Sequence, residues 1–344
     1  MLIQKNRAYL YILISQGRGV LMIELKNITK TYRIRKRSAG LKNAFRTFFK
    51  KDYEVVKALD DISFKINEGE MVGYIGPNGA GKSTTIKIMA GILTPDSGQA
   101  NISGLIPWKQ RTKYVKDIGV VFGNRSGLWW DVPVDDSFEL LKHIYKIPED
   151  VYKEQKTKLV KLLDIEEIIK IPTRQLSLGQ RMRCEIASAF LHKPKIVFLD
   201  EPTIGLDAVS KIAVREFINK INKEDKTTII LTTHDTQDIE ALTNRIILIG
   251  KGKILLDGKL SDLKKKFSKK YLTVEFNGDI DELCDGLIFV EKHKGRIKIE
   301  LNENMITLAK AIAFLTSKIE ILDLEVDNTS VDDIVVKLYQ EYGI

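Results

Sequence analysis

The feature that most constrains the fold is the run Gly-Pro-Asn-Gly-Ala-Gly-Lys-Ser at positions 76–83. It follows a short apolar run, Met71–Ile75, and leads into a predicted helix, Ser83–Ala90, which Gly91 ends. Glycines in such a turn allow backbone conformations that a Cβ would forbid, so several backbone N–H groups can point at one oxyanion. A G-x-x-x-x-G-K-S run between a strand and a helix therefore predicts a loop that encloses phosphate, called the phosphate loop below.

Around this loop, short buried runs alternate with helical stretches. The runs at 195–199 and 227–232 are apolar enough for buried strands, whereas 210–222 has helical spacing. Such alternation predicts an α/β domain with a largely parallel sheet, which we place at 22–262. A helical subdomain at about 130–185 interrupts the domain, because apolar residues recur there on one helical face.

The pattern changes after a lysine-rich stretch, 263–270, which we interpret as a basic linker. Strands are predicted beyond it at 271–276, 287–292, 297–301 and 319–326, and helices at 279–284, 305–317 and after a capping Ser330. Residues 271–344 should therefore form a small accessory α+β domain. Residues 1–21 are predicted to be an N-terminal extension, since Met22 opens a more regular segment.

Composition narrows the cellular setting. The 344 residues are 44% hydrophobic, which is enough for a packed core. The two cysteines, Cys184 and Cys284, are too few for a disulfide framework, which favours a reducing compartment such as the cytoplasm. No run reaches the ~18–20 apolar residues that span a bilayer. The net charge of +9 leaves nucleic acid, an anionic membrane surface and plain surface solvation open.

Two carboxylates at the end of another apolar run indicate chemistry beyond phosphate binding. Lys82 is placed to reach the β- and γ-phosphates of a nucleotide, and Ser83 to bind Mg²⁺. The run 196–199 ends in Asp200 and Glu201, and a buried strand that ends in two acids is costly unless those acids act. Asp200 suits the Mg²⁺ shell, and Glu201 suits the orientation and deprotonation of an attacking water. The sequence therefore predicts nucleotide hydrolysis.

Three further motifs make this pattern more specific. Leu-Ser-Leu-Gly-Gln at 176–180, called the signature motif below, precedes a predicted helix. Gly205-Leu206-Asp207 follows the acidic pair, and Thr233-His234-Asp235 follows a predicted strand. In this order and spacing, the motifs of 22–258 resemble those of the ATPase subunits of ABC transporters. The resemblance implies a P-loop NTPase fold with a helical subdomain, and ATP as the nucleotide.

The resemblance also implies roles for single residues. Ser177 and Gly179 would close over the ATP held by an opposite subunit, so that hydrolysis requires a head-to-tail dimer. His234 would contact the γ-phosphate, and Asp207 would link the two sites across the dimer. Tyr32 resembles the aromatic residue that stacks on adenine.

Two positions depart from the family pattern. Leu178 stands in the signature motif where glycine is commoner. Asn124 stands where a glutamine usually touches Mg²⁺ and couples to the membrane partner. Asparagine carries the same amide on a side chain one methylene shorter, so a coupling role fits Asn124 better than direct metal contact.

The predicted site therefore consists of three sets of residues. Catalysis is assigned to Glu201, His234 and Lys82. ATP binding is assigned to Tyr32, Gly76, Pro77, Asn78, Gly79, Ala80, Gly81, Lys82, Ser83, Thr84, Asn124, Ser177, Gly179, Gln180 and Asp207. Mg²⁺ binding is assigned to Ser83, Asp200 and Asn124, with the contact of the shorter Asn124 side chain longer or bridged by water.

Within the family, the runs 201–207 and 128–131 and the residue Leu178 resemble the exporter branch. The resemblance implies a second ATPase subunit, identical or different, a separate transmembrane permease, and a peripheral place on the cytoplasmic face of the cell membrane. The alternative is a soluble ABC ATPase that acts on nucleic acid or ribosomes, which the charge permits. The single ATPase unit and the lack of a long heptad repeat argue against nucleic acid as a partner.

A basic insertion at 33–52 is rich in lysine and arginine and has no acid before Asp52. Leu41, Phe45 and Phe48 fall at helical spacing within it, which predicts a basic amphipathic helix. Two interpretations stay open. Residues 33–51 could contact a membrane surface or a partner, or the helix could pack on its own domain with a solvated basic face.

Overall fold

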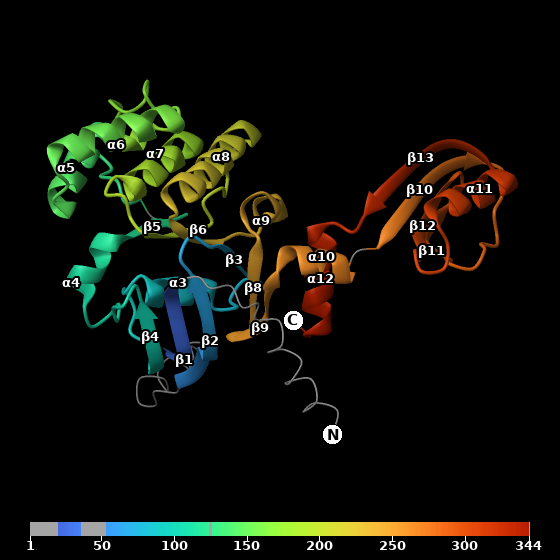
Figure 1. Cartoon of the computed structure of the whole chain (residues 1–344), viewed down its shortest axis with the longest axis horizontal. Helices are drawn as coiled ribbons and strands as arrows, with labels where there is room; N and C mark the ends of the chain where they lie inside the picture. Colours follow the sequence, from blue (N-terminus) through green and yellow to red (C-terminus); the bar gives the residue numbers. More distant parts are fainter. Residues whose placement is uncertain (1–19, 36–52, 124–125, 268, 344) are drawn as a thin grey trace, which may run out of the picture. The chain divides into compact units, whose positions relative to one another are not determined.

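The computed structural model describes residues 20–35, 53–123, 126–267 and 269–343 (Figure 1). They form two compact units, the first ending at Gly258 and the second beginning at Lys259. Three sequence predictions lie wholly or mostly outside the described residues: the N-terminal extension, the basic insertion and the role of Asn124.

The first unit is built around a sheet in which β3 (Met71–Ile75) lies between β7 and β8. The strand order is β5-β6-β7-β3-β8-β9, and the strands from β5 to β8 run parallel to their neighbours. The other strands are β5 (Ile118–Phe122), β6 (Ile196–Asp200), β7 (Thr228–Thr232), β8 (Arg245–Gly250) and β9 (Lys253–Lys259). Every residue of β3, β6 and β7 is buried, as expected of parallel strands covered on both faces. The predicted α/β fold with a largely parallel sheet is confirmed.

A second, antiparallel sheet shares a hydrophobic core with the parallel one. Its order is β2-β1-β4, formed by β1 (Leu21–Arg35), β2 (Tyr53–Asn67) and β4 (Ser97–Ile102). Ile23 and Ile62 of this sheet are buried together with Val72 of β3 and Ile86 of α3 (Lys82–Met89). The short helix α4 (Arg111–Tyr114) and the 3-10 turn η1 (Val115–Asp117) then lead into β5.

Helices form a further layer of the first unit (Figure 1). They are α5 (Val134–Tyr145), α6 (Glu149–Leu162), the 3-10 turn η2 (Thr173–Gln175), α7 (Leu178–Phe190), α8 (Ala208–Asp225) and α9 (Thr236–Leu242). A second core joins this layer to the sheet through residues such as Leu159, Ile186, Leu199 and Ile218. Cys184, in the middle of α7, is fully buried.

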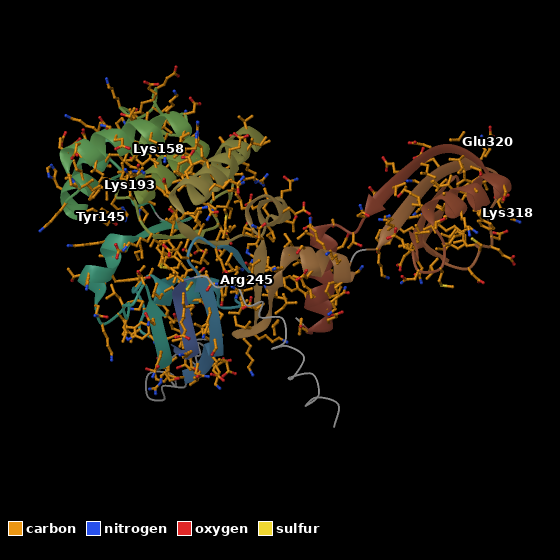
Figure 2. All side chains as sticks on the ribbon, viewed as in Figure 1. Tyr145, Lys158, Lys193, Arg245, Lys318 and Glu320 are labelled. Atoms are coloured by element: carbon orange, nitrogen blue, oxygen red, sulfur yellow. The ribbon has the colours of Figure 1, made fainter. Side chains whose placement is uncertain are left out.

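His192, just after α7, ties the helical layer to the sheet. Its ring stacks on that of Tyr145 at the end of α5, with centroids 3.9 Å apart and planes 4° from parallel. Figure 2 labels Tyr145 in the helical layer. Nε2 donates a hydrogen bond to the carbonyl oxygen of Ile118 across 2.9 Å, and Nδ1 is buried with no hydrogen-bond partner among the described residues. Burial disfavours the charged ring and lowers the pKa of His192 to about 4.

The second unit contains an antiparallel sheet with the order β11-β12-β10-β13. Its strands are β10 (Lys270–Asn277), β11 (Leu287–His293), β12 (Arg296–Leu301) and β13 (Glu320–Asn328). Leu315 of α11 (Leu308–Lys318) is buried with Leu272 and Ile299 of the sheet. The other two helices are α10 (Leu260–Phe267), which contacts α12, and α12 (Val331–Glu341), which Ser330 caps as predicted.

Two predictions for this part of the chain are wrong. Residues 279–284 form no helix, because Gly278 and Gly286 turn the backbone at each end (φ 107 and 93) and Ile280 is drawn into the core of the sheet. Cys284, in this segment, is half-buried. Residues 263–270, predicted to be a linker, belong mostly to α10 and to the start of β10. The division between the units falls before this helix, at Gly258, rather than at 262, since α10 contacts α12 of the second unit.

Candidate functional site

The phosphate loop lies between the buried end of β3 and the first turn of α3. A Cβ on Gly76 would lie 2.2 Å from the carbonyl oxygen of Ile249 in β8, so only glycine fits there. Gly81 is the N-cap of α3 and offers no side chain to the N–H groups of the first turn, which leaves them for an external acceptor such as phosphate. The remaining side chains of the loop differ in exposure: Asn78 and Ser83 are exposed, Pro77 and Thr84 are half-buried and Ala80 is buried.

The side chain of Lys82 folds back onto the first residues of the phosphate loop. Its Nζ donates to the carbonyl oxygens of Gly76 at 2.6 Å and Pro77 at 3.1 Å, and lies 3.3 Å from Nε2 of His234. Burial lowers the pKa of Lys82, while the charges of Glu201 and Asp200 act in the opposite direction. The ammonium group therefore lies among the phosphate loop, the acidic pair and His234.

The acidic pair, Asp200 and Glu201, lies at the end of β6, and Thr232 at the end of β7 holds both residues in place. The Thr232 hydroxyl donates to Oδ1 of Asp200 at 2.5 Å, and the backbone N–H of Glu201 donates to the Thr232 carbonyl at 3.0 Å. Asp200 is buried, whereas the Glu201 side chain keeps 28% of its surface exposed. Glu201 has a left-handed backbone (φ 57), which is uncommon for a residue with a side chain and is found where a turn must aim a functional group.

His234 completes this first group of site residues. Its Nε2 lies 3.1 Å from Oε1 of Glu201 and 3.3 Å from Nζ of Lys82, and its side chain is 44% exposed. The structure therefore brings together all three predicted catalytic side chains and Asp200 at the ends of β3, β6 and β7. An imidazole that contacts both a carboxylate and an ammonium group beside a phosphate loop can bind a phosphoryl group and direct a water at it.

The signature motif forms a second group, at the start of α7. The Ser177 hydroxyl accepts the backbone N–H of Gln180 at 3.2 Å, and Oε1 of Gln180 accepts the backbone N–H of Ser177 at 3.0 Å, so the two residues form a capping box. Asp207 lies beside it as the N-cap of α8 and accepts hydrogen bonds from the N–H (2.9 Å) and hydroxyl (3.0 Å) of Ser210. The Ser210 backbone bond lowers the pKa of Asp207. A Cβ on Gly179 would lie 3.0 Å from Oγ of Ser210, which shows how closely the two helix starts pack.

The two groups do not meet through polar contacts. Among the described residues, no hydrogen bond or ion pair joins Ser177 or Asp207 to Lys82, Glu201 or His234. Ser177 and Asp207 are both exposed, so their side chains are available to a partner. The signature group therefore adds no polar contact to the first group of the same chain.

Tyr32 is the remaining predicted nucleotide contact that the structure describes. It lies on β1 opposite Val56 of β2, and 37% of its surface is exposed. An exposed aromatic ring on a paired strand can stack on a base. Asn124 lies outside the described residues.

Sequence reasoning missed the residues that hold the site in place. Thr232 is one, and its signal is a hydroxyl at the end of a buried strand. Glu185 on α7 was missed as well, and it holds the turn at 126–127: its carboxylate, 7% exposed, accepts hydrogen bonds from the Ser126 hydroxyl and from the N–H of Gly127 at 2.8 Å. Burial raises the pKa of Glu185. An acid on an otherwise buried helix face was the signal for it.

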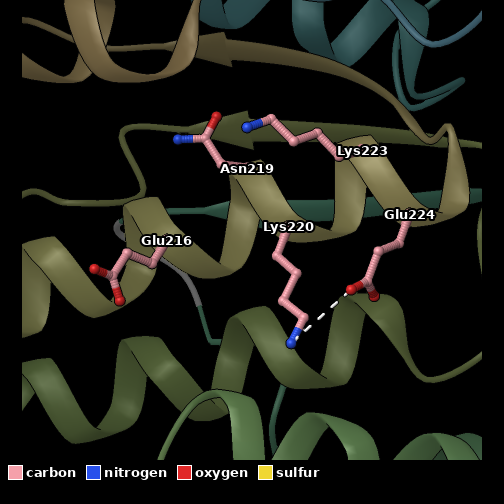
Figure 3. A pocket seen from close by; sticks show the side chains of 5 residues that line it. All are labelled: Glu216, Asn219, Lys220, Lys223 and Glu224. Carbon is pink, nitrogen blue, oxygen red and sulfur yellow. Dashed lines mark ion pairs between the residues drawn. The ribbon is translucent and has the colours of Figure 1, made fainter.

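A hollow on the outer face of α8 is separate from this site. It is lined by Glu216, Asn219, Lys220, Lys223 and Glu224, with a long ion pair of 3.9 Å between Lys220 and Glu224 (Figure 3). All five residues come from one helix, and none belongs to the phosphate loop, the acidic pair or the signature motif. Surface ion pairs of this kind contribute little to stability.

Comparison with known proteins agrees with this geometry. The family described as "ABC transporter" matches residues 59–204. The ABC transporter ATP-binding protein NatA of Bacillus subtilis (strain 168) is 33% identical over 215 residues, which cover 62% of this chain and 87% of NatA. The bacitracin transport ATP-binding protein BcrA of Bacillus licheniformis is 28% identical over 303 residues, which cover 84% of this chain and 94% of BcrA.

Solved structures agree as well. The dimeric, post-hydrolysis structure of the ATP-binding cassette MJ0796 with ADP and Pi has a TM-score of 0.58 and 29% identity, and the match covers 70% of this chain and 99% of that cassette. In the part of this chain that the structure describes, no helix is both long and apolar enough to cross a bilayer.

Proposed function

Because the chain belongs to the ATP-binding subunits of ABC transporters, which are ATPases, we propose that it works as half of a head-to-tail dimer that drives a separate transmembrane permease. One observation carries the proposal. Within the described part of the chain, no direct hydrogen bond or ion pair joins the phosphate-binding group to the exposed Ser177 and Asp207. Two chains in opposite orientation would place each signature group over the nucleotide of the other. The dimeric cassette structure with 29% identity supports this arrangement.

Within one site, the phosphate loop binds the ATP phosphates through backbone N–H groups and the start of α3. Lys82 gives up its loop carbonyls for the β- and γ-phosphates, which are stronger acceptors for a buried ammonium group. Tyr32 stacks on the adenine, since its exposed ring lies on β1 of the same unit. These contacts orient the terminal phosphate toward Glu201 and His234.

Mg²⁺ fits the oxygen donors beside the loop. The exposed Ser83 hydroxyl and the buried Asp200 carboxylate are hard ligands of the kind that Mg²⁺ takes together with phosphate oxygens and water. Once bound, the ion would neutralise charge on the transferred phosphoryl group. Thr232 holds Asp200 in place for this role.

Glu201 orients and deprotonates the attacking water, and His234 contacts the γ-phosphate. The 3.1 Å contact between Nε2 of His234 and Oε1 of Glu201 keeps the two side chains on one target. Ser177 of an opposing chain would approach the same phosphate from the start of α7, where the capping box already holds its backbone. Asp207, beside Gly179, would face the other site of the dimer.

Export is the direction of transport that we propose, with the chain on the cytoplasmic face of the membrane. BcrA, a bacitracin transport protein, matches over 84% of this chain, whereas the first unit ends at Gly258 of 344 residues, so the match includes part of the second unit. Part of the second unit is therefore shared with a transport protein. This favours a transporter over an ATPase that acts on nucleic acid.

Glu201→Gln tests the dimer and the role of the base. The variant keeps the shape of the side chain, and we expect phosphate release to fall about 10²–10⁴-fold while ATP and Mg²⁺ hold the chain as a dimer. Light scattering after size exclusion measures the dimer. Glu216→Gln makes the same change on the exposed face of α8 and should behave like the wild type (Figure 3). A Glu201→Gln chain that stays monomeric with ATP would contradict the dimer.

Affinity purification of the tagged full chain from membranes in mild detergent tests the partner. We expect a protein with several spanning helices to co-purify. Recovery with ribosomes or nucleic acid, from a fraction free of membranes, would contradict the proposal.

A further inference from the structure

Asp238 lies in the first turn of α9, four residues after His234, and is fully buried. Three donors surround its carboxylate. Oδ1 accepts from Nε of Arg215 at 2.6 Å, and Oδ2 accepts from the hydroxyl of Thr233 at 2.9 Å and from that of Thr203 in a short hydrogen bond. A buried carboxylate is tolerated only with such partners, because a charge without them costs several kcal/mol.

The two threonines lie next to the reacting groups. Thr203 stands two residues after Glu201, and Thr233 immediately precedes His234. Both threonines are buried, with 2% and 4% of their surface exposed. A single oxygen of Asp238 therefore joins the two loops whose side chains meet at 3.1 Å. Hydrogen bonds to an ionised acceptor in a buried site are shorter and stronger than neutral ones, so this oxygen fixes the position of one loop relative to the other.

The backbone of Glu201 makes such fixing necessary. Its left-handed conformation (φ 57) is unfavourable for a residue with a side chain and persists only where neighbouring contacts enforce it. The Thr203 hydroxyl supplies one contact on the far side of that turn, and the Glu201 N–H bond to Thr232 supplies another on the near side.

Arg215 extends the network to α8. Its Nη2 lies 3.4 Å from Oδ2 of Asp235, which also accepts from Lys211 at 2.6 Å. Arg215 and Lys211 belong to the helix that Asp207 caps. The loops of Glu201 and His234 are thereby joined to α8 through Asp238 and Arg215.

We propose that Asp238 is a positioning residue for ATP hydrolysis: its shared carboxylate oxygen holds the loop of Glu201 in register with the loop of His234. The inference rests on the roles proposed above for Glu201 and His234. It predicts that the hydroxyls of Thr203 and Thr233 are both needed for the rate of hydrolysis. Neither is needed for ATP binding, since both donate to Asp238.

The experiment uses the full chain with Thr203→Val, Thr233→Val and both changes together. Valine has the shape of threonine without the hydroxyl. Thr227→Val is the matched control, because Thr227 is also buried but precedes β7, whereas Thr233 follows it. Thr203→Ser and Thr233→Ser keep the hydroxyl and test for rescue. The measurements are kcat for ATP hydrolysis, the Kd of ATP and the Tm of each variant.

Each valine variant should lower kcat about 10-fold, the scale on which a small misplacement of catalytic groups acts, with the Kd of ATP within about two-fold of the control. The double variant should match the single ones, because one lost hydroxyl already breaks the link. The serine variants should restore kcat. The Thr233 hydroxyl also accepts the backbone N–H of Asp235, so Thr233→Val could disturb that turn. Thr203→Val keeps this bond and provides the test even where Thr233→Val does not fold.

Three results would overturn the inference. The first is a kcat equal to that of Thr227→Val. The second is a loss of kcat that follows the folded fraction or the ATP affinity. The third is a double variant whose loss is the product of the single losses. Glu201→Gln and His234→Ala separate this failure from failure of the proposed function, since full hydrolysis in those two variants would refute the roles of Glu201 and His234 themselves.

Discussion

Gly81→Ala tests how the phosphate loop is packed against β2. Gly81 has φ 112, and a Cβ on it would lie 2.6 Å from the carbonyl oxygen of Ala58 and 2.8 Å from Cδ2 of Leu59. Gly79, two residues earlier, also has a positive φ, 79, but a Cβ there would meet nothing within 4 Å. Both glycines have a positive φ, but that of Gly81 lies farther from the left-handed minimum, and only Gly81 lacks space for a Cβ.

The size of the effect follows from this difference. Alanine with positive φ costs about 1–2 kcal/mol at Gly79 and at least as much at Gly81, and the loss of freedom in the unfolded chain is the same for both. Only Gly81→Ala adds a clash with backbone, and overpacking of this kind costs about 1–3 kcal/mol. We expect Gly81→Ala to be less stable than Gly79→Ala by about 2 kcal/mol, or about 4–8 °C in Tm for a unit of this size.

Tryptophan fluorescence during urea and thermal unfolding measures the difference. The chain has three tryptophans, Trp108, Trp129 and Trp130, and all lie in the first unit, so the signal reports the unfolding of that unit. The measurements are made without nucleotide, because ligand binding would add its own contribution to stability. Equal urea midpoints for Gly79→Ala and Gly81→Ala would refute the close approach of the loop to Ala58.

Two predictions concern buried titratable groups. Because the pKa of Glu185 is raised above 4.5, its contribution to stability is present below pH 4.5 and is lost as pH rises through the raised pKa. In urea titrations, Glu185→Gln should therefore gain stability relative to the wild type from acid to neutral pH. A stability difference between the two proteins that does not change with pH would contradict this. The pKa of His192 is lowered from 6.5 to about 4, so its contribution is present above 6.5 and is lost as pH falls toward 4. Across that window wild type should lose about 3 kcal/mol more than His192→Gln in the same titrations, and parallel curves would refute it.

Local patterns in the sequence predicted the parts of the site that are themselves local. Three parts of the candidate site occupy only a few consecutive residues each: the phosphate loop, the acidic pair at the end of β6 and the signature motif. The spacing of apolar residues around them predicts the neighbouring strand or helix. The parallel sheet followed from the same alternation. Local spacing fails where tertiary contacts decide the structure: it predicts a linker where α10 forms, and a helix at 279–284 where Ile280 packs into the core of the sheet.

Contacts between distant residues were beyond prediction from one sequence. Asp238 and Thr203 are 35 positions apart, and Glu185 and Ser126 are 59 apart. Nothing in the spacing of these residues indicates that they touch. An aspartate at the start of a helix is ordinarily a capping or solvated residue, and only burial among three donors separates Asp238 from that ordinary case.

The two cysteines make the two units chemically distinguishable. Burial raises the pKa of Cys184 to about 12 and shields it within α7, so this thiol stays protonated and inert at neutral pH. Cys284, half-buried in the second unit, is then the position that a maleimide dye will label. The wild-type chain thus carries donors in one unit, the tryptophans, and a unique attachment point for an acceptor in the other. Energy transfer between them would follow the separation of the units through the ATP cycle without a single substitution.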